Sequence, residues 1–239
     1  MSAASVETLL RELRSLGSPR NVEGMARYGI HSARAFGVPG PQLKRLAREI
    51  GPDHALARRL WATGIYDARA LAFLVDDPER VTESQMDRWA GDFDNWAICD
   101  GACIHLFRRT PFAHRKALEW SLRPEEFVKR GAFALMAALA VHDKDAADAV
   151  FISFLEIVER ESGDERNGVK KAVNWALRQV GKRSPALNAA AIRTGERIRA
   201  RSTRAARWIA SDALRELRSE AVQRRLAAAT ARRAAARGR

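Results

Sequence analysis

A carboxylate among aromatic side chains is the first feature of this sequence that could do chemistry. Residues 94–109 have the apolar spacing of a helix, and one face of that helix would carry Trp96, Asp100, Cys103 and Phe107. An unpaired buried carboxylate is unfavourable, so an ordinary helix would bury an apolar residue at that point. Asp100 is therefore either a structural residue, paired with an arginine or capping a neighbouring helix, or a carboxylate held ionised in a hydrophobic cleft to meet a developing positive charge.

A tryptophan on the polar side of a second predicted helix is the other such feature. An apolar stripe that should face the core is formed by Val169, Ala172, Val173, Ala176, Leu177 and Val180. On the opposite side Trp175 lies among Lys171, Arg178 and Lys182. Trp175 is either a surface ring stacked on lysine and arginine stems or an aromatic wall beside cations that bind phosphates.

Other kinds of catalytic centre find little support in the sequence. The two cysteines, Cys99 and Cys103, and the scattered histidines do not have the spacing of a four-ligand zinc site, and two cysteines cannot staple a secreted scaffold. The chain has no glycine-rich phosphate loop and no nucleophile elbow. We therefore expect neither a metal nor a cofactor.

The elements that must position these residues are predicted to be helices. Helical spacing and end signals indicate helices near residues 9–16, 41–50, 53–61, 67–75, 82–91, 94–109, 111–122, 125–141, 144–162, 166–181, 185–200 and 203–217. No stretch alternates apolar and polar residues as a strand would, so the class is all-α. Antiparallel helix pairs that repeat at about 40 residues would form a superhelical HEAT-like solenoid, whose curvature leaves a concave face for an extended partner.

The charge of the chain indicates a polyanionic partner. Its 42 lysines and arginines exceed its 29 acidic residues by 13, and residues 193–239 alone carry 14 arginines against four acids. Such an excess is typical of nucleic-acid binding, although a codon bias toward G and C would also enrich arginine and alanine. We predict one domain over residues 1–217, with a basic concave cleft, and a mobile Ala/Arg-rich tail over residues 218–239.

Two further expectations concern where the protein works. The longest apolar run, residues 132–141, is too short to span a membrane, which needs about 20 residues. The N-terminus has the pattern of an amphipathic helix and lacks that of a signal peptide. We therefore expect a cytoplasmic protein that associates with the nucleoid and makes no membrane contact.

Several ordered stretches resemble the AlkD-type DNA alkylation repair enzymes, which are HEAT-like-repeat glycosylases that remove alkylated purines. The stretches are EGMARYGIHSARAFGVPGPQLKRLA (23–47), YDARALA (66–72), WAGDFDNWAICD (89–100), EEFVKRGAFALMA (125–137) and RNGVKKAVNWALRQVGK (166–182). They cover roughly residues 20–215 in the order of the family. The resemblance implies the HEAT-like solenoid that periodicity alone leaves open.

The resemblance also implies roles for particular residues. The family's catalytic aspartate matches Asp100, its paired tryptophans match Trp96 and Trp175, and its cleft arginine matches Arg130. Arg130 would then hold phosphates together with Lys171, Arg178 and Lys182. The chain departs from close relatives beside the first tryptophan, where they can carry a second aromatic and an acid and this chain has Asn95 and Ala97.

The chemistry that follows is hydrolysis of an N-glycosidic bond. Alkylation at N7 or N3 makes a purine cationic and a good leaving group, and its departure leaves an oxocarbenium-like sugar. Asp100 would stabilise that charge and position water, while both tryptophans pack on the deoxyribose. We expect 7-methylguanine and 3-methyladenine in duplex DNA as substrates, with uracil and 8-oxoguanine rejected. The family is implied to work without extruding the base into a pocket.

Two other functions compete with the glycosylase. In the first, the solenoid is a non-catalytic module that binds damaged or branched DNA, and its DNA function would not depend on the charge of Asp100. In the second, it is a protein-interaction scaffold, whose binding would lack the steep salt dependence of phosphate contacts. We expect a monomer in each case.

Overall fold

The chain is helical throughout the part that the structure describes. The computed structural model describes residues 5–32 and 34–237, and within them it contains 14 α-helices, one 3-10 helix and no strand. The expected all-α class is therefore confirmed. The chain forms two compact units, residues 1–113 and residues 114–239, and each is described by itself below. The assignment of residues 1–217 to a single domain stays a prediction.

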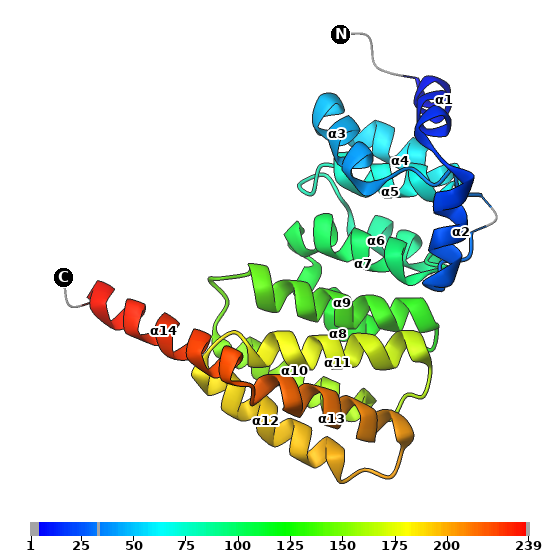
Figure 1. The fold of residues 1–239 in the computed structure, drawn as a ribbon. Coiled ribbons are helices and arrows are strands. Elements are labelled where there is room, and N and C mark those ends of the chain that lie inside the picture. The colour runs from blue at the N-terminus through cyan, green and yellow to red at the C-terminus, as the bar shows by residue number, and fades with distance from the viewer. Residues whose placement is uncertain (1–4, 33, 238–239) are drawn as a thin grey trace. The chain divides into compact units, whose positions relative to one another are not determined.

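The first unit surrounds an aromatic core. Its helices are α1 (Val6–Leu16), α2 (Pro19–Arg27), α3 (Gly40–Ile50), α4 (His54–Ala62), α5 (Tyr66–Val75), α6 (Glu83–Gly91) and α7 (Trp96–His105), followed by the 3-10 helix η1 (Phe107–Arg109) (Figure 1). The rings of Trp61 and Trp89 stack with 4.0 Å between centroids, and Phe107 packs against Trp89. This core fixes α4, α6 and η1 to one another.

Helix α2 lies outside every range that the sequence predicted to be helical. It begins with Pro19 in its first turn and buries none of its residues. Periodicity detects a helix through its buried stripe, so a helix without one gives no signal. Proline in the first turn was the available clue, because its fixed φ suits that position.

A buried carboxylate anchors the loop between α2 and α3. Asp67, in the first turn of α5, is fully buried and accepts hydrogen bonds from the backbone N–H groups of Phe36 (2.5 Å) and Val38 (2.8 Å). Bonds from neutral donors to an ionised acceptor are stronger than ordinary ones. The loop around Val38 is therefore held against α5.

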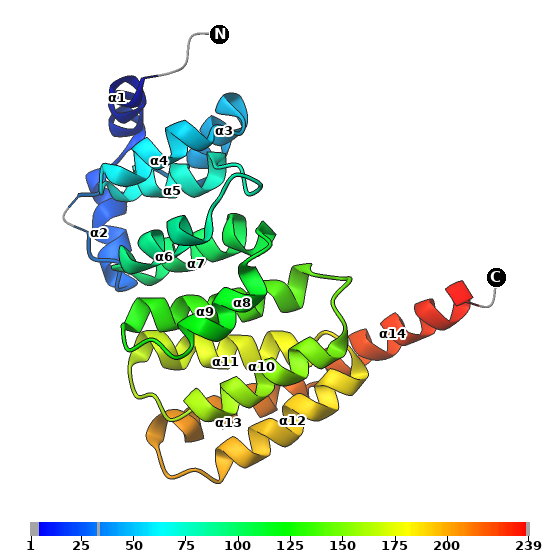
Figure 2. The same ribbon diagram turned by 180° about the vertical axis from the view of Figure 1, so that it is seen from behind.

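The second unit has two layers of helices. Its helices are α8 (Ala113–Trp120), α9 (Glu126–His142), α10 (Asp148–Glu161), α11 (Asn167–Gly181), α12 (Pro185–Arg199), α13 (Arg204–Leu217) and α14 (Glu220–Arg237). Helices α9, α11 and α13 run side by side in Figure 1, and α8, α10 and α12 form the layer that faces the viewer in Figure 2. The α10–α11 pair begins at residues 148 and 167 and the α12–α13 pair at residues 185 and 204, so the repeat is 37 residues. This spacing is slightly shorter than the about 40–47 residues of HEAT repeats, which are also built from helix pairs.

Polar residues join α11 to α13 in a regular ladder. Asn174 donates a hydrogen bond to Asp212 (2.7 Å) and Arg178 donates one to Glu216 (2.5 Å), and both pairs are 38 residues apart in the sequence. One turn earlier at the same separation, the Lys170 ammonium lies 5.4 Å from the centroid of the Trp208 ring. The repeat therefore matches successive turns of the two helices.

The segment that the sequence predicted to be a mobile tail is helical over most of its length. Helix α14 begins at Glu220 and buries Val222 and Leu226, which are 7% and 4% exposed. Its packing partners are α12 and α13. The first turns of the segment thus belong to the packed unit, while its mobility and its last two residues lie outside what the structure describes.

Candidate nucleic-acid interface

Helix α7 places the predicted carboxylate and the first tryptophan one turn apart. Asn95 caps the helix by accepting hydrogen bonds from the N–H groups of Ala97 and Ile98, both at 3.0 Å. Trp96 is 38% exposed, and its indole N–H donates to the carbonyl of Tyr28 (2.9 Å). Asp100 is half-buried. Asn95 is one of the two residues at which the chain departs from the family pattern. It therefore has a structural role in holding this turn.

A close packing contact positions the backbone beside Asp100. The ring of Phe73 on α5 lies so near Gly101 that no Cβ would fit there. Phe73 also stacks on His105 with 5.9 Å between ring centroids.

Helix α7 ends at His105, so it is shorter than the predicted helix over residues 94–109. Phe107 lies beyond this end, in η1, where it is buried against Trp89. The aromatic neighbour that the structure gives Asp100 along α7 is thus Trp96.

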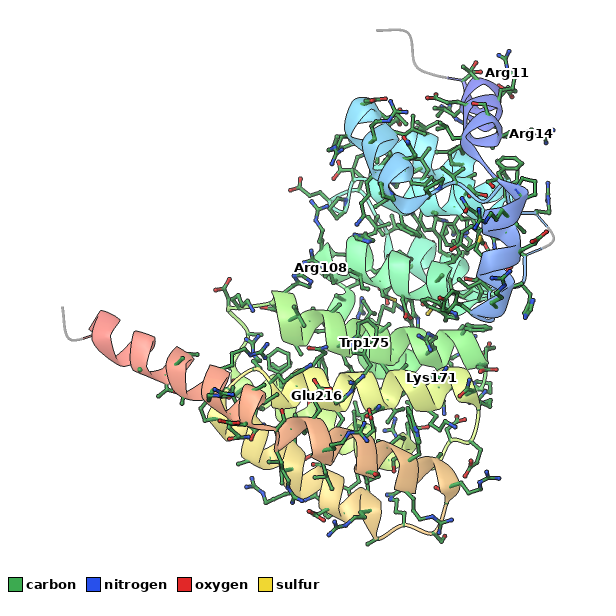
Figure 3. All side chains as sticks on the ribbon, viewed as in Figure 1. Arg11, Arg14, Arg108, Lys171, Trp175 and Glu216 are labelled. Atoms are coloured by element: carbon green, nitrogen blue, oxygen red, sulfur yellow. The ribbon has the colours of Figure 1, made fainter. Side chains whose placement is uncertain are left out.

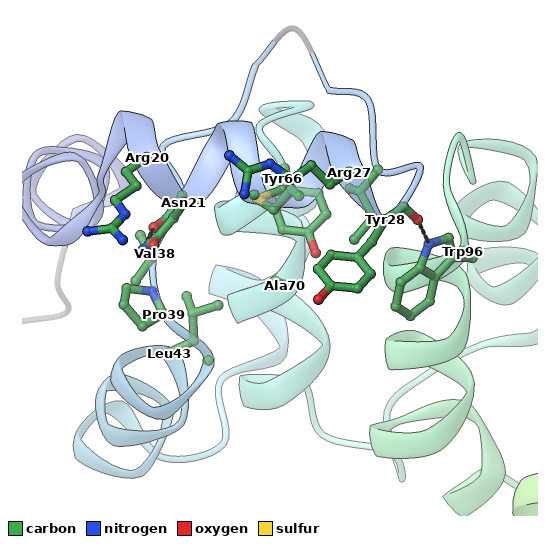
Figure 4. Close-up of a pocket in the computed structure, with 15 residues that line it drawn as sticks. Arg20, Asn21, Arg27, Tyr28, Val38, Pro39, Leu43, Tyr66, Ala70 and Trp96 are labelled. Atoms are coloured by element: carbon green, nitrogen blue, oxygen red, sulfur yellow. Dashed lines mark hydrogen bonds between the residues drawn. The ribbon is translucent and has the colours of Figure 1, made fainter.

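A groove in the first unit begins at Trp96. It has a volume of about 780 Å³ and lies among α2, the loop that follows it, α3, α5 and α7. Figure 4 shows the rings of Tyr66 and Tyr28 in its middle, with Pro39 and Leu43 toward one end and Trp96 at the other. The chain contains two tyrosines, and both line this groove. The sequence analysis did not name either as a site residue, although both lie in stretches that carry the family resemblance, 23–47 and 66–72.

The phenol of Tyr66 stays protonated at neutral pH. Burial raises the pKa of this group to about 12, and the carboxylates of Asp67 and Asp94 add to the rise. The hydroxyl is therefore a neutral hydrogen-bonding group among the aromatic and aliphatic residues of the groove.

In the second unit, Trp175 and Lys171 lie on α11 as predicted. Every residue of the predicted apolar stripe on α11 is buried, which confirms that assignment. Trp175 is half-buried, and Lys171, one turn earlier, is exposed and forms no ion pair within the described residues (Figure 3). Lys171 is thus available to an anionic partner.

The two cations after Trp175 are held by a carboxylate of the next repeat. Glu216 accepts hydrogen bonds from Arg178 and from Lys182, both at 2.5 Å. Burial alone would raise the pKa of Glu216, but these two bonds outweigh it and lower that pKa below its ordinary value. Glu216 therefore stabilises this contact at any pH above the usual pKa of a carboxylate. As the pH falls through the lowered pKa of Glu216, the carboxylate becomes protonated and this stabilisation is lost.

Arg130 is buried between α9 and α11. Its side chain, 7% exposed, donates to the carbonyl of Gly168 (2.7 Å) in the first turn of α11. The N–H of Gly168 in turn donates to Glu126 (3.0 Å). In this structure Arg130 therefore fastens the start of the helix that carries Trp175.

The described residues show neither a metal site nor a membrane-spanning helix. No group of three or more histidine, cysteine, aspartate or glutamate side chains is arranged to hold a metal ion in that part of the chain. Over the same residues, none of the helices combines the length and the apolar character that crossing a bilayer requires.

The comparisons with known proteins agree on one family of folds. The family model for DNA alkylation repair enzymes matches residues 9–217. A solved structure with a TM-score of 0.73 is 24% identical and is covered to 83% of its length, against 81% of this chain. It is described as a member of a new family of proteins related to the HEAT-like repeat DNA glycosylases, with affinity for branched DNA structures. No curated protein matches the chain.

Proposed function

Because the chain belongs to the family of DNA alkylation repair enzymes, we propose that it is a DNA glycosylase acting on cationic alkylated purines in double-stranded DNA. The observation that supports this most directly is the half-buried carboxylate of Asp100 one helical turn from the partly exposed Trp96. A carboxylate fixed on a helix is preorganised for a positive charge that develops beside it. Trp175, from the second unit, is the proposed second aromatic contact.

The proposed reaction needs one carboxylate. The bond between C1′ and the ring nitrogen breaks, and its electron pair neutralises the cationic purine, which leaves without protonation. The sugar becomes an oxocarbenium ion that Asp100 stabilises, and water held by Asp100 adds to C1′ and loses a proton. The products are a neutral alkylpurine and an abasic site. A neutral base such as uracil would lack the charged leaving group and would stay in place.

The test of this function is single-turnover excision. Duplex DNA containing one 7-methylguanine is incubated with excess protein, and the abasic site is cleaved with alkali. We expect strand cleavage with 7-methylguanine and with 3-methyladenine, and none with uracil or 8-oxoguanine. Binding to the 7-methylguanine duplex without any cleavage would refute the proposed activity.

We propose Lys171, Arg178, Lys182 and Arg130 as the residues that hold the DNA backbone in the second unit. They differ in how they could do so, because Lys171 is exposed whereas Glu216 holds Arg178 and Lys182. A phosphate must therefore compete with Glu216 for those two cations. Arg130 is buried and would act by holding the start of α11.

Replacing Glu216 by glutamine is expected to strengthen DNA binding. The change removes the carboxylate that Arg178 and Lys182 share and leaves Arg178 with the longer ion pair to Asp212 (3.8 Å), so both cations become more available to phosphates. Each added phosphate contact steepens the dependence of log K on log salt by about 0.9. The measurement is the dissociation constant at several salt concentrations. The matched control is Glu156→Gln, which changes the charge equally at an exposed residue of α10; equal effects of the two variants would show that Arg178 and Lys182 do not contact DNA.

Removing residues 231–239 is expected to weaken DNA binding and leave excision unchanged at saturating protein. This segment contains Arg232, Arg233, Arg237 and Arg239, and its removal spares the buried Val222 and Leu226. Fewer cations mean fewer counterions released from DNA and a shallower salt dependence. A full-length variant with the four arginines replaced by glutamine should behave in the same way. Loss of excision at saturation would instead place part of the catalytic function in this helix.

A second function is favoured by the structural comparison. The similar solved structure is described as having affinity for branched DNA, so a non-catalytic DNA-binding module is the alternative proposal. In that case DNA binding would be unaffected by Asp100→Asn, and no 7-methylguanine would be released by either protein.

A further inference from the structure

The groove of the first unit leaves aromatic surface in contact with water. Tyr28 is 77% exposed and Trp96 is 38% exposed, and both are among the few large apolar side chains of the described residues that are this accessible. The other end of the groove is aliphatic, from Val38, Pro39 and Leu43. A hollow of this kind, with aromatic faces from its middle to one end and aliphatic carbons toward the other, suits a flat heterocycle.

Two unpaired arginines stand beside this aromatic surface. Arg20 and Arg27 are exposed residues of α2 that line the groove, and no carboxylate pairs with either of them in the described part of the chain. In Figure 4 Arg27 lies next to Tyr66, while Arg20 lies at the end occupied by Pro39. If a ring were bound in the groove, these two arginines could each pair with an anion attached on one side of that ring.

The interior of the groove offers a neutral polar group in addition. The Tyr66 hydroxyl, whose pKa of about 12 keeps it protonated, has no protein partner among the described residues. It can donate or accept one hydrogen bond at the edge of a ring. A nucleobase within a strand matches these features, because it is a flat heterocycle with polar edges and has a negatively charged phosphate on either side.

We propose that this groove binds an unpaired nucleobase of DNA, with the adjoining phosphates on Arg20 and Arg27. The inference deepens the proposed DNA function, since it assigns to the first unit a preference for DNA with a gap, a frayed end or a branch. Stacking on aromatic side chains does not depend on which base is present. The site therefore recognises the unpaired state of a base and not its alkylation.

The glycine at position 24 allows the groove to be filled without disturbing the fold. Gly24 is a helical residue of α2 that lines the groove, and a Cβ added there would have no atom within 4 Å. Gly24→Leu places a bulky side chain in that space. Gly24→Ala is the matched control, because alanine also replaces glycine in the helix and leaves most of the volume open.

The test compares two undamaged DNAs of equal length, a blunt duplex and the same duplex with one unpaired thymine. Wild type and Gly24→Ala are expected to bind the second DNA about tenfold more tightly, the effect of one stacked base. Gly24→Leu should bind both equally. With 5-bromouracil at the unpaired position, irradiation should crosslink the base to Tyr28 or Trp96. No preference in wild type, or a preference that Gly24→Leu keeps, would overturn the proposal.

Two additional measurements separate the possible failures. The double variant Arg20→Gln, Arg27→Gln changes exposed residues only, and it should also lose the preference, so the test does not rest on the folding of Gly24→Leu. Excision of 7-methylguanine is measured on the blunt duplex with the same proteins. Preference without excision would refute the glycosylase and keep the groove, whereas excision without preference would refute the groove alone.

Discussion

Asp100→Asn is expected to slow base excision severely while the affinity for DNA stays the same. Asparagine has the shape of aspartate and lacks its charge, so the variant removes the negative charge that would stabilise the oxocarbenium ion. Removing one preorganised electrostatic contact to a transition state lowers rates by about 10²–10³-fold. The measurement is the single-turnover rate on a 7-methylguanine duplex, with the dissociation constant determined on the same DNA.

The matched control for this result is Asp94→Asn. Asp94 is exposed, precedes the same helix, and accepts a hydrogen bond from the side chain of Asn95 (2.6 Å). The substitution changes the net charge of the unit by the same amount at a neighbouring position. We expect it to keep excision within a few-fold of wild type. If both variants lost activity equally, the effect would be one of general charge, and Asp100 would have no particular role.

The sequence allowed prediction of those elements that bury a regular stripe. Helix α11 shows this most clearly, because each residue of its predicted apolar face is buried. Helix α2 shows the limit, since it buries nothing and was missed. The same limit applies to the end of α7, where apolar spacing continues to Phe107 although the helix ends at His105. The spacing of apolar residues thus predicts which positions are buried, and it predicts the length of a helix only indirectly.

The residue pattern of a single helix could not predict the charge pairs that form between repeats. On α11 alone, Arg178 and Lys182 look like cations of an open polar face. Their partner, Glu216, is 38 residues after Arg178 and lies in another helix. The available signal was the repeat itself: since alternate helices such as α11 and α13 start 37 residues apart, residues about 38 apart come opposite each other on these two helices. Without a recognised repeat, that register cannot be derived from helical spacing.

The groove of the first unit was missed for a different reason. Its walls come from a helix without a buried stripe, a loop and one or two residues of each of three further helices, so no sequence window contains them. Among the groups that hold the loop in place is the carboxylate of Asp67, more than 25 residues away in the sequence. Long-range backbone hydrogen bonds of this kind leave no periodic trace in a sequence. In the sequence, nothing distinguishes Asp67 from an ordinary charged residue at the start of a helix.

Asp67→Ala is therefore expected to have the largest effect on stability of any single change considered for the first unit. The substitution leaves two N–H groups without their acceptor, that of the buried Val38 and that of the half-buried Phe36. A buried donor left unsatisfied costs about 1–3 kcal/mol and a half-buried one costs less, so we expect a loss of roughly 2–4 kcal/mol in the free energy of unfolding. Urea unfolding followed by tryptophan fluorescence measures it, because the stacked Trp61 and Trp89 lie in this unit.

Two comparisons make this expectation specific to the anchored loop. Asp67→Asn keeps one acceptor oxygen and should lose less stability than the alanine variant. Glu79→Ala removes the same charge at an exposed position and should change the free energy of unfolding by less than about 0.5 kcal/mol. In hydrogen exchange, the amides of Phe36 and Val38 should lose protection in Asp67→Ala before those of the unit's helices. Since Val38 lines the groove, the same variant should also lose the preference for unpaired DNA, and unchanged protection of these two amides would show that Asp67 does not anchor the loop.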